Sequence, residues 1–383
     1  MRYDFDRLTD RRGTGSLKWD VAEWELPMWV ADMDFETAPE IKAAILKRAE
    51  SGIFGYSITP DAFFDAVRGW WKRRHNADFA TEWMVYSNGI VAAVSSAVRK
   101  FTTPNENVLV QAPVYNIFYN SIVNNGRRVL SSDLVYENGA YRVDFCDLER
   151  KLSDPQTSLM ILCNPHNPVG KIWSREELSK IGELCRKYGV TVISDEIHCD
   201  ITEPGSEYTP FASVSDTCAD ISVSCFSASK TFNIAGLQSA CLVAKNPVLR
   251  HKIWRAVNTD EVGEPNAFAM DANIAAFTLC DDWCDEMRRY VFDNRRIAEN
   301  FIRERLPMLR TPHGEASYLM WVDVSAVTDN SEAFAKKLRE ETGLFVNDGA
   351  EYGGNGKLFI RINLATQRVR VLDGLSRLEG MLK

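Results

Sequence analysis

Short apolar runs recur along the middle of the chain, and each one is followed by a polar stretch or by a loop with Gly or Pro. The runs, rich in β-branched and aliphatic residues, are Val108–Val110, Leu159–Leu162, Val190–Ile193 and Ile221–Val223. Continuous apolar runs of this length are typical of strands buried on both faces of a parallel sheet. We therefore predict that these four runs are strands of one such sheet.

The segment between the second and third runs predicts a helix with clear ends. Ser174 and Glu177 form a capping-box pattern, in which each side chain satisfies a backbone N–H of the other residue. Apolar residues then recur at helical spacing, and Gly189 ends the helix. Strand–helix–strand alternation predicts an α/β fold, with a mostly parallel sheet flanked by helices on both faces.

The C-terminal part of the chain has a different pattern. Helical periodicity is found around 283–306 and 331–342, and β-like runs occupy Tyr318–Asp323 and Leu358–Asn363. This mixture predicts a smaller α+β domain beside the larger one. A chain of 383 residues is long enough for two domains.

Composition narrows the class of protein. Hydrophobic residues make up 45% of the chain and charged residues 26%, as in ordinary globular proteins. The 45 basic and 53 acidic residues give a net charge of −8, which disfavours a nucleic-acid partner because phosphate binding needs clustered Lys and Arg. The first residues lack the apolar run of a signal peptide, and no window approaches the roughly 18 apolar residues of a membrane span. We therefore expect a cytoplasmic protein with neither a nucleic-acid nor a membrane partner.

The cysteines and histidines do not form a metal-binding pattern. None of the nine cysteines belongs to a Cys-x-x-Cys pair, and Cys280 and Cys284 have no further pair of ligands to complete a tetrahedral site. His166 and His198 have no second ligand three or four residues later. We predict buried thiols in a reducing compartment and no metal.

The residues that follow the predicted strands are the first candidates for a site, because ligands of open α/β sheets bind beyond the carboxyl ends of the strands. Four strand ends carry reactive or polar residues, namely Ser87-Asn88-Gly89 after Val85-Tyr86, Asn164–Pro168, Ser194–His198 and Ser227–Lys230. They place an Asp, a Lys, an Asn and the start of a helix from Ile90 at one edge of the sheet.

Each of these residues has an ordinary explanation when it is taken alone. A lysine after a strand is usually a surface charge, and Asp195 could be a loop or capping carboxylate. Asn88-Gly89 could be a plain turn, and 164–168 a proline-stiffened loop. Arg361 alternates with apolar neighbours and could lie on an exposed strand face.

The same residues also suit one chemistry. A desolvated lysine has a depressed pKa and can attack an aldehyde, as Lys230 would. Asp195 can keep a pyridine nitrogen protonated, so that the ring draws electrons from a carbanion. The N–H groups after Gly89 can bind a phosphate. The Asn167 amide can donate to a phenolate or carboxylate, and Arg361 can clamp a substrate carboxylate.

Taken together, these segments resemble the fold-type I enzymes that depend on pyridoxal 5′-phosphate (PLP), the aspartate aminotransferase superfamily. The resemblance is carried by Asn-Pro-His-Asn-Pro at 164–168, Ser-Asp-Glu at 194–196, Ser-Ala-Ser-Lys at 227–230 and Phe-Ile-Arg-Ile-Asn at 359–363. Within it, the chain is most similar to the cystathionine β-lyase-type carbon–sulfur lyases. That closer similarity is carried by Pro27–Phe35, Phe54–Tyr56, Asp195–His198, Ser229–Leu237 and Asp348–Ala365.

The resemblance covers essentially the whole chain and implies the PLP-dependent transferase fold. We predict a large PLP-binding domain of residues 46–284, and a small α+β domain with an N-terminal arm made of residues 1–45 and 285–383. The resemblance also implies a homodimer with shared active sites, in which Tyr56 reaches into the site of the other subunit.

Roles for individual residues follow from the same resemblance. Lys230 would form the internal aldimine with PLP and then move the α-proton of the substrate. Asp195 would pair with the pyridine nitrogen, and Asn167 would donate to the phenolic oxygen of the ring. Arg361, together with Asn167, would bind the substrate carboxylate. The other cofactor contacts are stacking by Tyr115 and phosphate binding by Gly89, Ile90, Val91 and Ser227.

Two positions depart from the pattern of many aminotransferases. Gln238 stands eight residues after the lysine, where those enzymes carry an arginine that pairs with the phosphate. His198 stands where many have a tyrosine, and we expect it to contact the cofactor in a role that the sequence leaves open. Backbone amides and hydroxyls would then bind more of the phosphate. The lyase branch tolerates both changes.

The function implied is that of a carbon–sulfur β-lyase acting on cystathionine or related S-substituted cysteines. Lys230 would remove the α-proton, a thiolate would leave the β-carbon, and the remainder would hydrolyse to pyruvate and ammonia. An aminotransferase is the alternative, because it shares every step up to the carbanion. A regulatory protein that keeps the fold to bind a partner is a third hypothesis.

Overall fold

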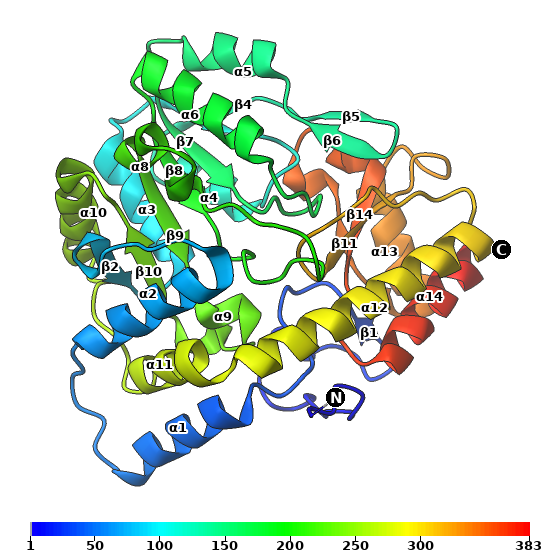
Figure 1. Ribbon diagram of the computed structural model, residues 1–383. Helices are drawn as coiled ribbons and strands as arrows, with labels where there is room; N and C mark the ends of the chain where they lie inside the picture. The colour runs from blue at the N-terminus through cyan, green and yellow to red at the C-terminus, as the bar shows by residue number, and fades with distance from the viewer. Residues whose placement is uncertain (1) are drawn as a thin grey trace.

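The computed structural model describes residues 2–383 (Figure 1). Its main sheet has seven strands. In chain order they are β2 (Met84–Ser87), β3 (Asn107–Val110), β4 (Arg128–Ser131), β7 (Thr157–Cys163), β8 (Thr191–Asp195), β9 (Ser222–Phe226) and β10 (Ala240–Val243). Their spatial order is β2-β10-β9-β8-β7-β3-β4, and only β10 runs against the others among the described residues. The predicted mostly parallel sheet is confirmed.

The four strand predictions are confirmed except at two first residues, Val190, which precedes β8, and Ile221. Ile221 ends helix α8 (Asp216–Ile221), and the strand begins one residue later. The Oγ of Ser215 accepts a hydrogen bond from the N–H of Cys218 at 3.2 Å, so a capped helix runs up to the strand without a loop. The apolar character of Ile221 serves packing between that helix and the sheet.

Helices cover both faces of the main sheet, as predicted (Figure 1). Because successive strand residues point to opposite faces, Val108 and Val110 join one core and Leu109 the other. The first face packs against α3 (Ile90–Phe101), α4 (Ile117–Val123) and α10 (Pro247–Thr259). The second packs against α8, α2 (Asp61–His75), α5 (Phe145–Leu152), α6 (Arg175–Tyr188) and α11 (Ala269–Leu279).

Helix α6 has the ends that its sequence predicts. The Oγ of Ser174 accepts from the N–H of Glu177 at 3.1 Å, and the Glu177 carboxylate accepts from the N–H of Ser174 at 2.9 Å. Gly189 ends the helix with a φ of 71°, in the left-handed region that glycine adopts without strain.

The C-terminal part forms the predicted α+β unit. An antiparallel sheet has the order β11 (Leu319–Asp323), β14 (Phe359–Asn363) and β13 (Asn347–Asp348). It packs against α12 (Asp281–Arg305), α13 (Ser331–Thr342) and α14 (Arg368–Leu382). The N-terminal β1 (Leu26–Pro27) pairs in parallel with β12 (Leu344–Phe345) and so joins this unit.

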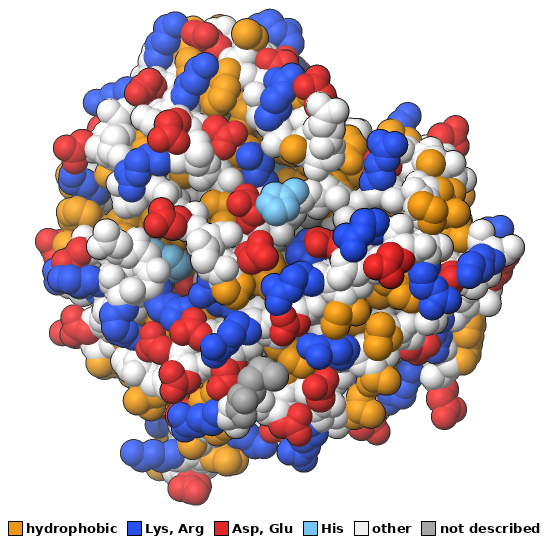
Figure 2. Space-filling model, turned by 45° about the vertical axis from the view of Figure 1, so that its right-hand side comes forward, with side chains coloured by type: hydrophobic (Ala, Val, Ile, Leu, Met, Phe, Trp, Pro, Cys, Tyr) orange, Lys and Arg blue, Asp and Glu red, His pale blue; other side chains and the backbone are white. Residues whose placement is uncertain are grey.

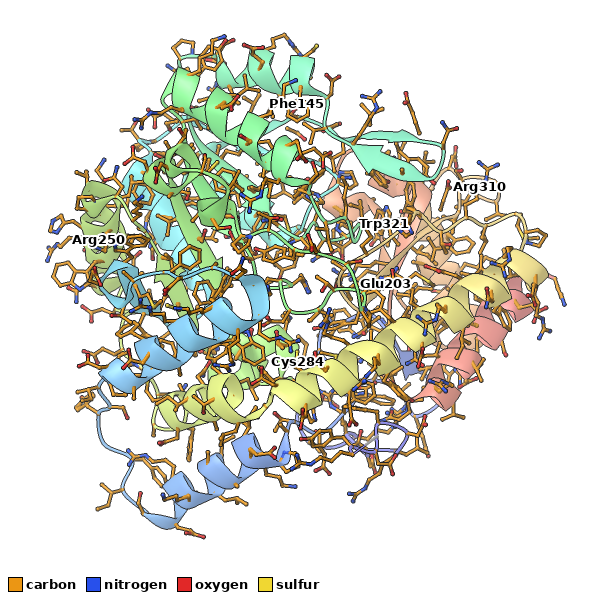
Figure 3. All side chains as sticks on the ribbon, in the orientation of Figure 1. Phe145, Glu203, Arg250, Cys284, Arg310 and Trp321 are labelled. Carbon is orange, nitrogen blue, oxygen red and sulfur yellow. The ribbon has the colours of Figure 1, made fainter. Side chains whose placement is uncertain are left out.

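Helix α12 connects the two parts of the molecule (Figures 1 and 3). Its first turns, with Cys284 (labelled in Figure 3), pack into the core beside the main sheet, whereas Ala298 and Ile302 pack into the C-terminal core. The predicted boundary after residue 284 falls inside this continuous helix. The division of the chain at residues 45 and 284 stays a prediction.

A second contact between the two parts lies at Trp321, which is labelled in Figure 3. Its indole N–H on β11 donates to the hydroxyl of Tyr141 at 3.1 Å. Tyr141 belongs to a hairpin of β5 (Val135–Glu137) and β6 (Ala140–Arg142) that extends from the large part. This contact fixes β14, which pairs with β11, relative to the main sheet.

The remaining helices are α1 (Pro39–Glu50), α7 (Phe211–Val214) and α9 (Ala228–Thr231). Basic and acidic side chains are interspersed over the face shown in Figure 2. In residues 2–383, no helix is both long and apolar enough to cross a membrane. All nine cysteines are free thiols, and Cys146 is the exposed one.

Candidate active site

A cavity of about 410 Å³ lies at the carboxyl ends of β2, β7, β8 and β9, where the sequence places the site. The sequence-predicted residues that line it are Gly89, Ile90, Val91, Tyr115, Asn167, Asp195, His198, Ser227 and Lys230. Segments that are far apart in the chain therefore meet in one cavity. Their individual roles stay predictions.

Two predicted site residues lie outside the lining of this cavity. Arg361 is adjacent to it, because its Nη1 donates to the Oδ1 of Asn167 at 3.3 Å. Tyr56 is fully exposed, on a segment between α1 and α2 that is neither helix nor strand. The structure of a single chain does not bring Tyr56 to the other residues.

Lys230 lies in the short helix α9 directly after β9. Ser227 caps this helix, because its Oγ accepts from the N–H of Ser229 at 3.1 Å. The Nζ of Lys230 donates to the backbone oxygen of Ala31 at 2.6 Å. Burial lowers the pKa of the Lys230 amine to about 8. The carboxylates of Asp32 and Asp195 act in the opposite direction, but the effect of burial is larger. Roughly one tenth of the amine is therefore neutral and nucleophilic at pH 7, far more than for an ordinary lysine.

We predict that amine-selective labelling reveals this depressed pKa. The neutral amine is the reactive form, so with a pKa of about 8 the reactive fraction rises from roughly one tenth at pH 7 to roughly nine tenths at pH 9. Acetylation of Lys230 in the apoprotein should thus accelerate about tenfold and then level off. An ordinary lysine, with a pKa of about 10.4, would accelerate roughly a hundredfold over the same range. Peptide mass spectrometry after brief acetic anhydride treatment measures both, and a hundredfold rise at Lys230 would contradict the assignment.

Asp195 ends β8 on the cavity side. Its Oδ1 accepts from the N–H of Ile197 at 3.2 Å. Burial raises the pKa of this carboxyl to about 7, and the neighbouring Glu196 carboxylate adds to the rise. A buried carboxylate in this state favours a cationic partner in the cavity, which would lower its pKa and hold it ionised.

The opposite end of the cavity is suited to an anion. Helix α3 begins at Ile90 without a side-chain cap, so the N–H groups of its first turn are not satisfied by its own residues. Gly89 has a φ of 139°, which an L side chain rarely adopts. The Oγ of Ser239 is buried without a hydrogen-bond partner in residues 2–383, and Ser239 lines the cavity. These donors can bind a phosphate without an arginine.

The predicted phosphate contact of Ser227 is less direct than that of Ser239. The hydroxyl of Ser227 donates to the backbone oxygen of Ser239 at 2.5 Å and also accepts from Ser229. Its hydrogen is therefore already in use, and it would have to reorient in order to donate to an anion.

Arg361 forms the third polar feature of the site. It is buried on β14, where its guanidinium donates to Asn167, to the backbone oxygen of Trp29 at 3.1 Å and to Asn347 at 2.8 Å. The face of the guanidinium lies over the ring of Tyr352, at 4.9 Å from its centre. Three hydrogen bonds leave two of its five donors, including a buried Nε–H without a partner in residues 2–383, for a carboxylate.

His198 and Tyr115 contribute neutral rings to the cavity. Burial lowers the pKa of His198 to about 3, so its imidazole is neutral, and its Nδ1 has no partner in residues 2–383. Burial raises the pKa of Tyr115 to about 12, so its phenol keeps its proton. Both rings can contact a planar ligand without adding charge.

Sequence reasoning missed several lining residues. The backbone oxygen of Ala31 carries no side-chain signature, although the stretch 27–35 is part of the resemblance. Ser239 follows Gln238, whose φ of 44° places it in the left-handed region and turns the chain toward the cavity. The presence of Gln238, in place of the arginine of many aminotransferases, is the one feature of the sequence that indicates a different phosphate contact here.

A cluster of potential metal ligands lies outside the cavity. Ligand atoms of His75, Cys199 and Asp200 fall within 4.8 Å of one another. The Asp200 carboxylate already accepts from His75 at 2.7 Å, from Thr231 at 2.9 Å and from the Trp70 indole at 2.9 Å. The cluster therefore has a structural explanation: through Thr231, the buried Asp200 carboxylate holds α9, the helix that carries Lys230.

Comparison with known proteins identifies the family. Residues 27–377 match the sequence model of the aminotransferase class I and II family. The chain belongs to this family. The resemblance seen in the sequence and the predicted PLP-dependent transferase fold are thereby confirmed.

Within this family, two curated relatives match from end to end. The chain is 43% identical to cystathionine beta-lyase PatB of Bacillus subtilis, over 99% of this chain and 100% of PatB. It is 32% identical to protein MalY of Escherichia coli, over 100% of this chain and 99% of MalY. Among solved structures it is similar to cystalysin of Treponema denticola, which contains a pyridoxal 5′-phosphate cofactor. The identity is 33% and the TM-score 0.96, over 100% of this chain and 99% of cystalysin.

Proposed function

We propose that this protein is a PLP-dependent carbon–sulfur β-lyase that cleaves cystathionine or related S-substituted cysteines to a thiol, pyruvate and ammonia. The observation that carries the proposal is the full-length identity of 43% to a cystathionine beta-lyase. The cavity supports it, because Lys230, Asp195 and the start of α3 all line the same space.

The residues of the cavity fit PLP. The volume of about 410 Å³ lies within the usual range of roughly 300 to 1,000 Å³ for small-molecule sites. The amine of Lys230 suits the aldehyde, the carboxyl of Asp195 suits the ring nitrogen, and the uncapped N-terminus of α3 with Ser239 suits the phosphate. When bound there, PLP supplies an electron sink for the charge that develops on the substrate α-carbon.

The chain itself binds the substrate and moves its proton. Arg361 binds the substrate carboxylate through its free donors. Asn167 accepts a hydrogen bond from Arg361 and helps to orient the guanidinium toward that carboxylate. The Nζ of Lys230 then takes the α-proton as a general base. Breaking of the bond between the β-carbon and sulfur leaves the electron pair on sulfur, and the Lys230 ammonium can return a proton to the thiolate.

The backbone oxygen of Ala31 holds the free Lys230 amine at the wall of the cavity. It accepts from the Nζ of Lys230 at 2.6 Å and from the hydroxyl of Tyr318 at 2.9 Å. The segment that carries it is fixed in turn, because the side chain of Asn363 donates to the backbone oxygens of Val30 and Asp32, each at 2.6 Å. Lys230 therefore has a defined resting position on the cavity side.

One assay separates the lyase from an aminotransferase. The aminotransferase is the alternative because the matching family is that of class I and II aminotransferases. Purified holoenzyme is incubated with cystathionine, with and without a keto acid, and free thiol and pyruvate are followed. Release of both without a keto acid is the expected result. Transfer of the amino group without thiol release would refute the lyase. Nothing in residues 2–383 specifically favours the third hypothesis, a regulatory protein.

We also propose a homodimer with shared sites. Tyr56 lies on a segment with three further exposed apolar residues, Ile53 (74%), Phe54 (56%) and Ile58 (80%). A contiguous apolar strip of this kind is typical of an interaction surface. A second copy of the chain would cover the strip and receive Tyr56 at its cofactor.

Mixing two inactive variants tests this arrangement. If Tyr56 acts in the other subunit, a mixed dimer of Lys230→Ala and Tyr56→Ala chains has one site with both changes and one site with neither. Random pairing of equal amounts should then restore about a quarter of wild-type activity per site. The measurement is pyruvate release after joint refolding or subunit exchange. Activity no higher than the average of the two separate variants would show that Tyr56 does not act across an interface.

A cytoplasmic location remains part of the proposal. It is supported by the nine free cysteines, since thiols in such number are typical of a reducing compartment. The proposed partner in the site is a small-molecule amino-acid substrate such as cystathionine.

A further inference from the structure

Glu196 is a buried carboxylate that none of the steps described above uses. It directly follows Asp195, and its side chain is completely buried. Its Oε2 accepts from the hydroxyl of Tyr208 at 2.5 Å, and its Oε1 accepts from the Oγ of Ser224 at 3.0 Å and from the N–H of Phe211 at 3.2 Å. All three partners are neutral groups that donate, so they stabilise the negative charge of Glu196 without cancelling it.

The peptide bond between Asp195 and Glu196 is held from both sides. Its carbonyl oxygen accepts from the N–H of Asn164, which follows β7, at 2.9 Å, and its N–H donates to the backbone oxygen of Cys225 on β9 at 2.8 Å. Successive side chains along extended backbone point to opposite faces of a sheet. Asp195 lines the cavity, whereas Glu196 contacts Tyr208 and does not line it. The backbone therefore sets the separation of the two carboxylates.

The charges of these two carboxylates act on each other. Charges in a buried region are screened much less than charges in water. Burial raises the pKa of Glu196 to about 7, and its three donors act in the opposite direction. The Glu196 carboxylate in turn raises the pKa of Asp195, whereas the Lys230 ammonium lowers it. A cation beside Asp195 would hold both carboxyl groups ionised, and two negative charges would then stabilise that cation instead of one.

We propose that Glu196 is a positioning residue for the cofactor ring, whose buried carboxylate strengthens the pairing of Asp195 with the protonated ring nitrogen of PLP. The inference rests on the PLP-binding part of the proposed function, and it holds for a lyase as well as for an aminotransferase. Glu196 acts through Asp195, across the end of β8. A purely structural role, in which Glu196 only joins α7 to the main sheet, makes a different prediction for the binding of two matched probes.

The two probes have the same shape and are added to the full-length apoprotein. PLP has a ring nitrogen, and 1-deaza-pyridoxal 5′-phosphate has a C–H group in its place; both keep the aldehyde and the phosphate. A nearby charge shifts a pKa by roughly one to three units, so loss of the Glu196 charge should weaken PLP binding about tenfold. Glu196→Gln keeps the shape of the side chain and its hydrogen-bonding capacity, so its affinity for the deaza probe should change by less than about threefold. Quenching of tryptophan fluorescence measures both dissociation constants.

Two further variants accompany Glu196→Gln. Ser224→Ala removes one of the three donors and shifts Glu196 toward its neutral form, so it should cause a smaller loss that is again selective for PLP. Its result decides the proposal on its own if Glu196→Gln does not fold. Glu207→Gln, at an exposed side chain next to Tyr208 in the chain, should change neither dissociation constant.

The outcomes separate the two roles of Glu196. An equal loss of affinity for both probes would overturn the proposal, because Glu196 would then only hold the structure together. Unchanged affinity for PLP in Glu196→Gln would overturn it as well. If the wild type binds both probes equally, Asp195 does not pair with the ring nitrogen, and the proposed cofactor contact fails together with this inference. Failure of the lyase assay alone would leave the binding results unchanged.

Discussion

The Lys230→Ala variant should lose carbon–sulfur cleavage by at least about 10³-fold in kcat and should no longer retain PLP through purification. General-base catalysis alone contributes roughly 10² to 10⁴-fold, and the covalent bond to the cofactor adds to that loss. Lys230 is the single lysine among the residues that line the cavity in the described chain, so no neighbouring amine can substitute for it. Pyruvate release and the absorption spectrum of the purified protein measure the two effects.

Two further variants separate the chemistry of Lys230 from its charge. Lys230→Arg keeps a positive charge but cannot add to an aldehyde at neutral pH, so we expect it to be as inactive as Lys230→Ala. Lys336→Ala removes a lysine that is 74% exposed on α13 and should behave as the wild type. Turnover of Lys230→Ala within tenfold of the wild type would show that another residue carries out the proton transfer.

The Arg361→Ala variant should lose about 30- to 5,000-fold in kcat/KM, mainly through a higher KM. Truncating one partner of a buried charged pair costs about 2 to 5 kcal/mol, and the buried guanidinium has donors left over for a substrate carboxylate. Loss of the side chain also leaves the Oδ1 of Asn347 without its donor. Steady-state kinetics with cystathionine measure the effect.

Arg361→Lys is the matched variant for this prediction. It keeps the charge but replaces a planar, bidentate donor by a single ammonium, so it should recover only part of the loss. Arg303→Ala, at a side chain that is 68% exposed on α12, should not change the kinetics. A KM for Arg361→Ala within threefold of the wild type would place the carboxylate-binding residue elsewhere.

The amino-acid sequence contains enough information to place Asp195 and Lys230 in the same site. They are 35 residues apart, but both follow buried runs, and the carboxyl ends of parallel strands share one edge of a sheet. Helix caps depend on residues that are close together in the chain. The helix from Ser174 to Gly189 can therefore be predicted with both of its ends.

Other parts of the site depend on contacts that no local pattern encodes. The bond between Lys230 and Ala31 uses a backbone oxygen, which every residue possesses. Arg361 and Asn167 are separated by 194 residues and meet only because the C-terminal unit docks against the main sheet. Tyr56 acts, on our proposal, in a second copy of the chain, so neither the sequence pattern nor one folded chain can show its contact.

Borohydride reduction of the PLP-loaded protein tests the central claim most directly. Reduction converts a lysine–aldehyde adduct into a stable secondary amine, which survives digestion and can be located by peptide mass spectrometry. We predict that the cofactor is found on the peptide that contains Lys230, with the Lys230→Ala variant unlabelled under the same conditions. Label on a different lysine, or none on a protein that shows PLP absorption and cleaves cystathionine, would contradict the account.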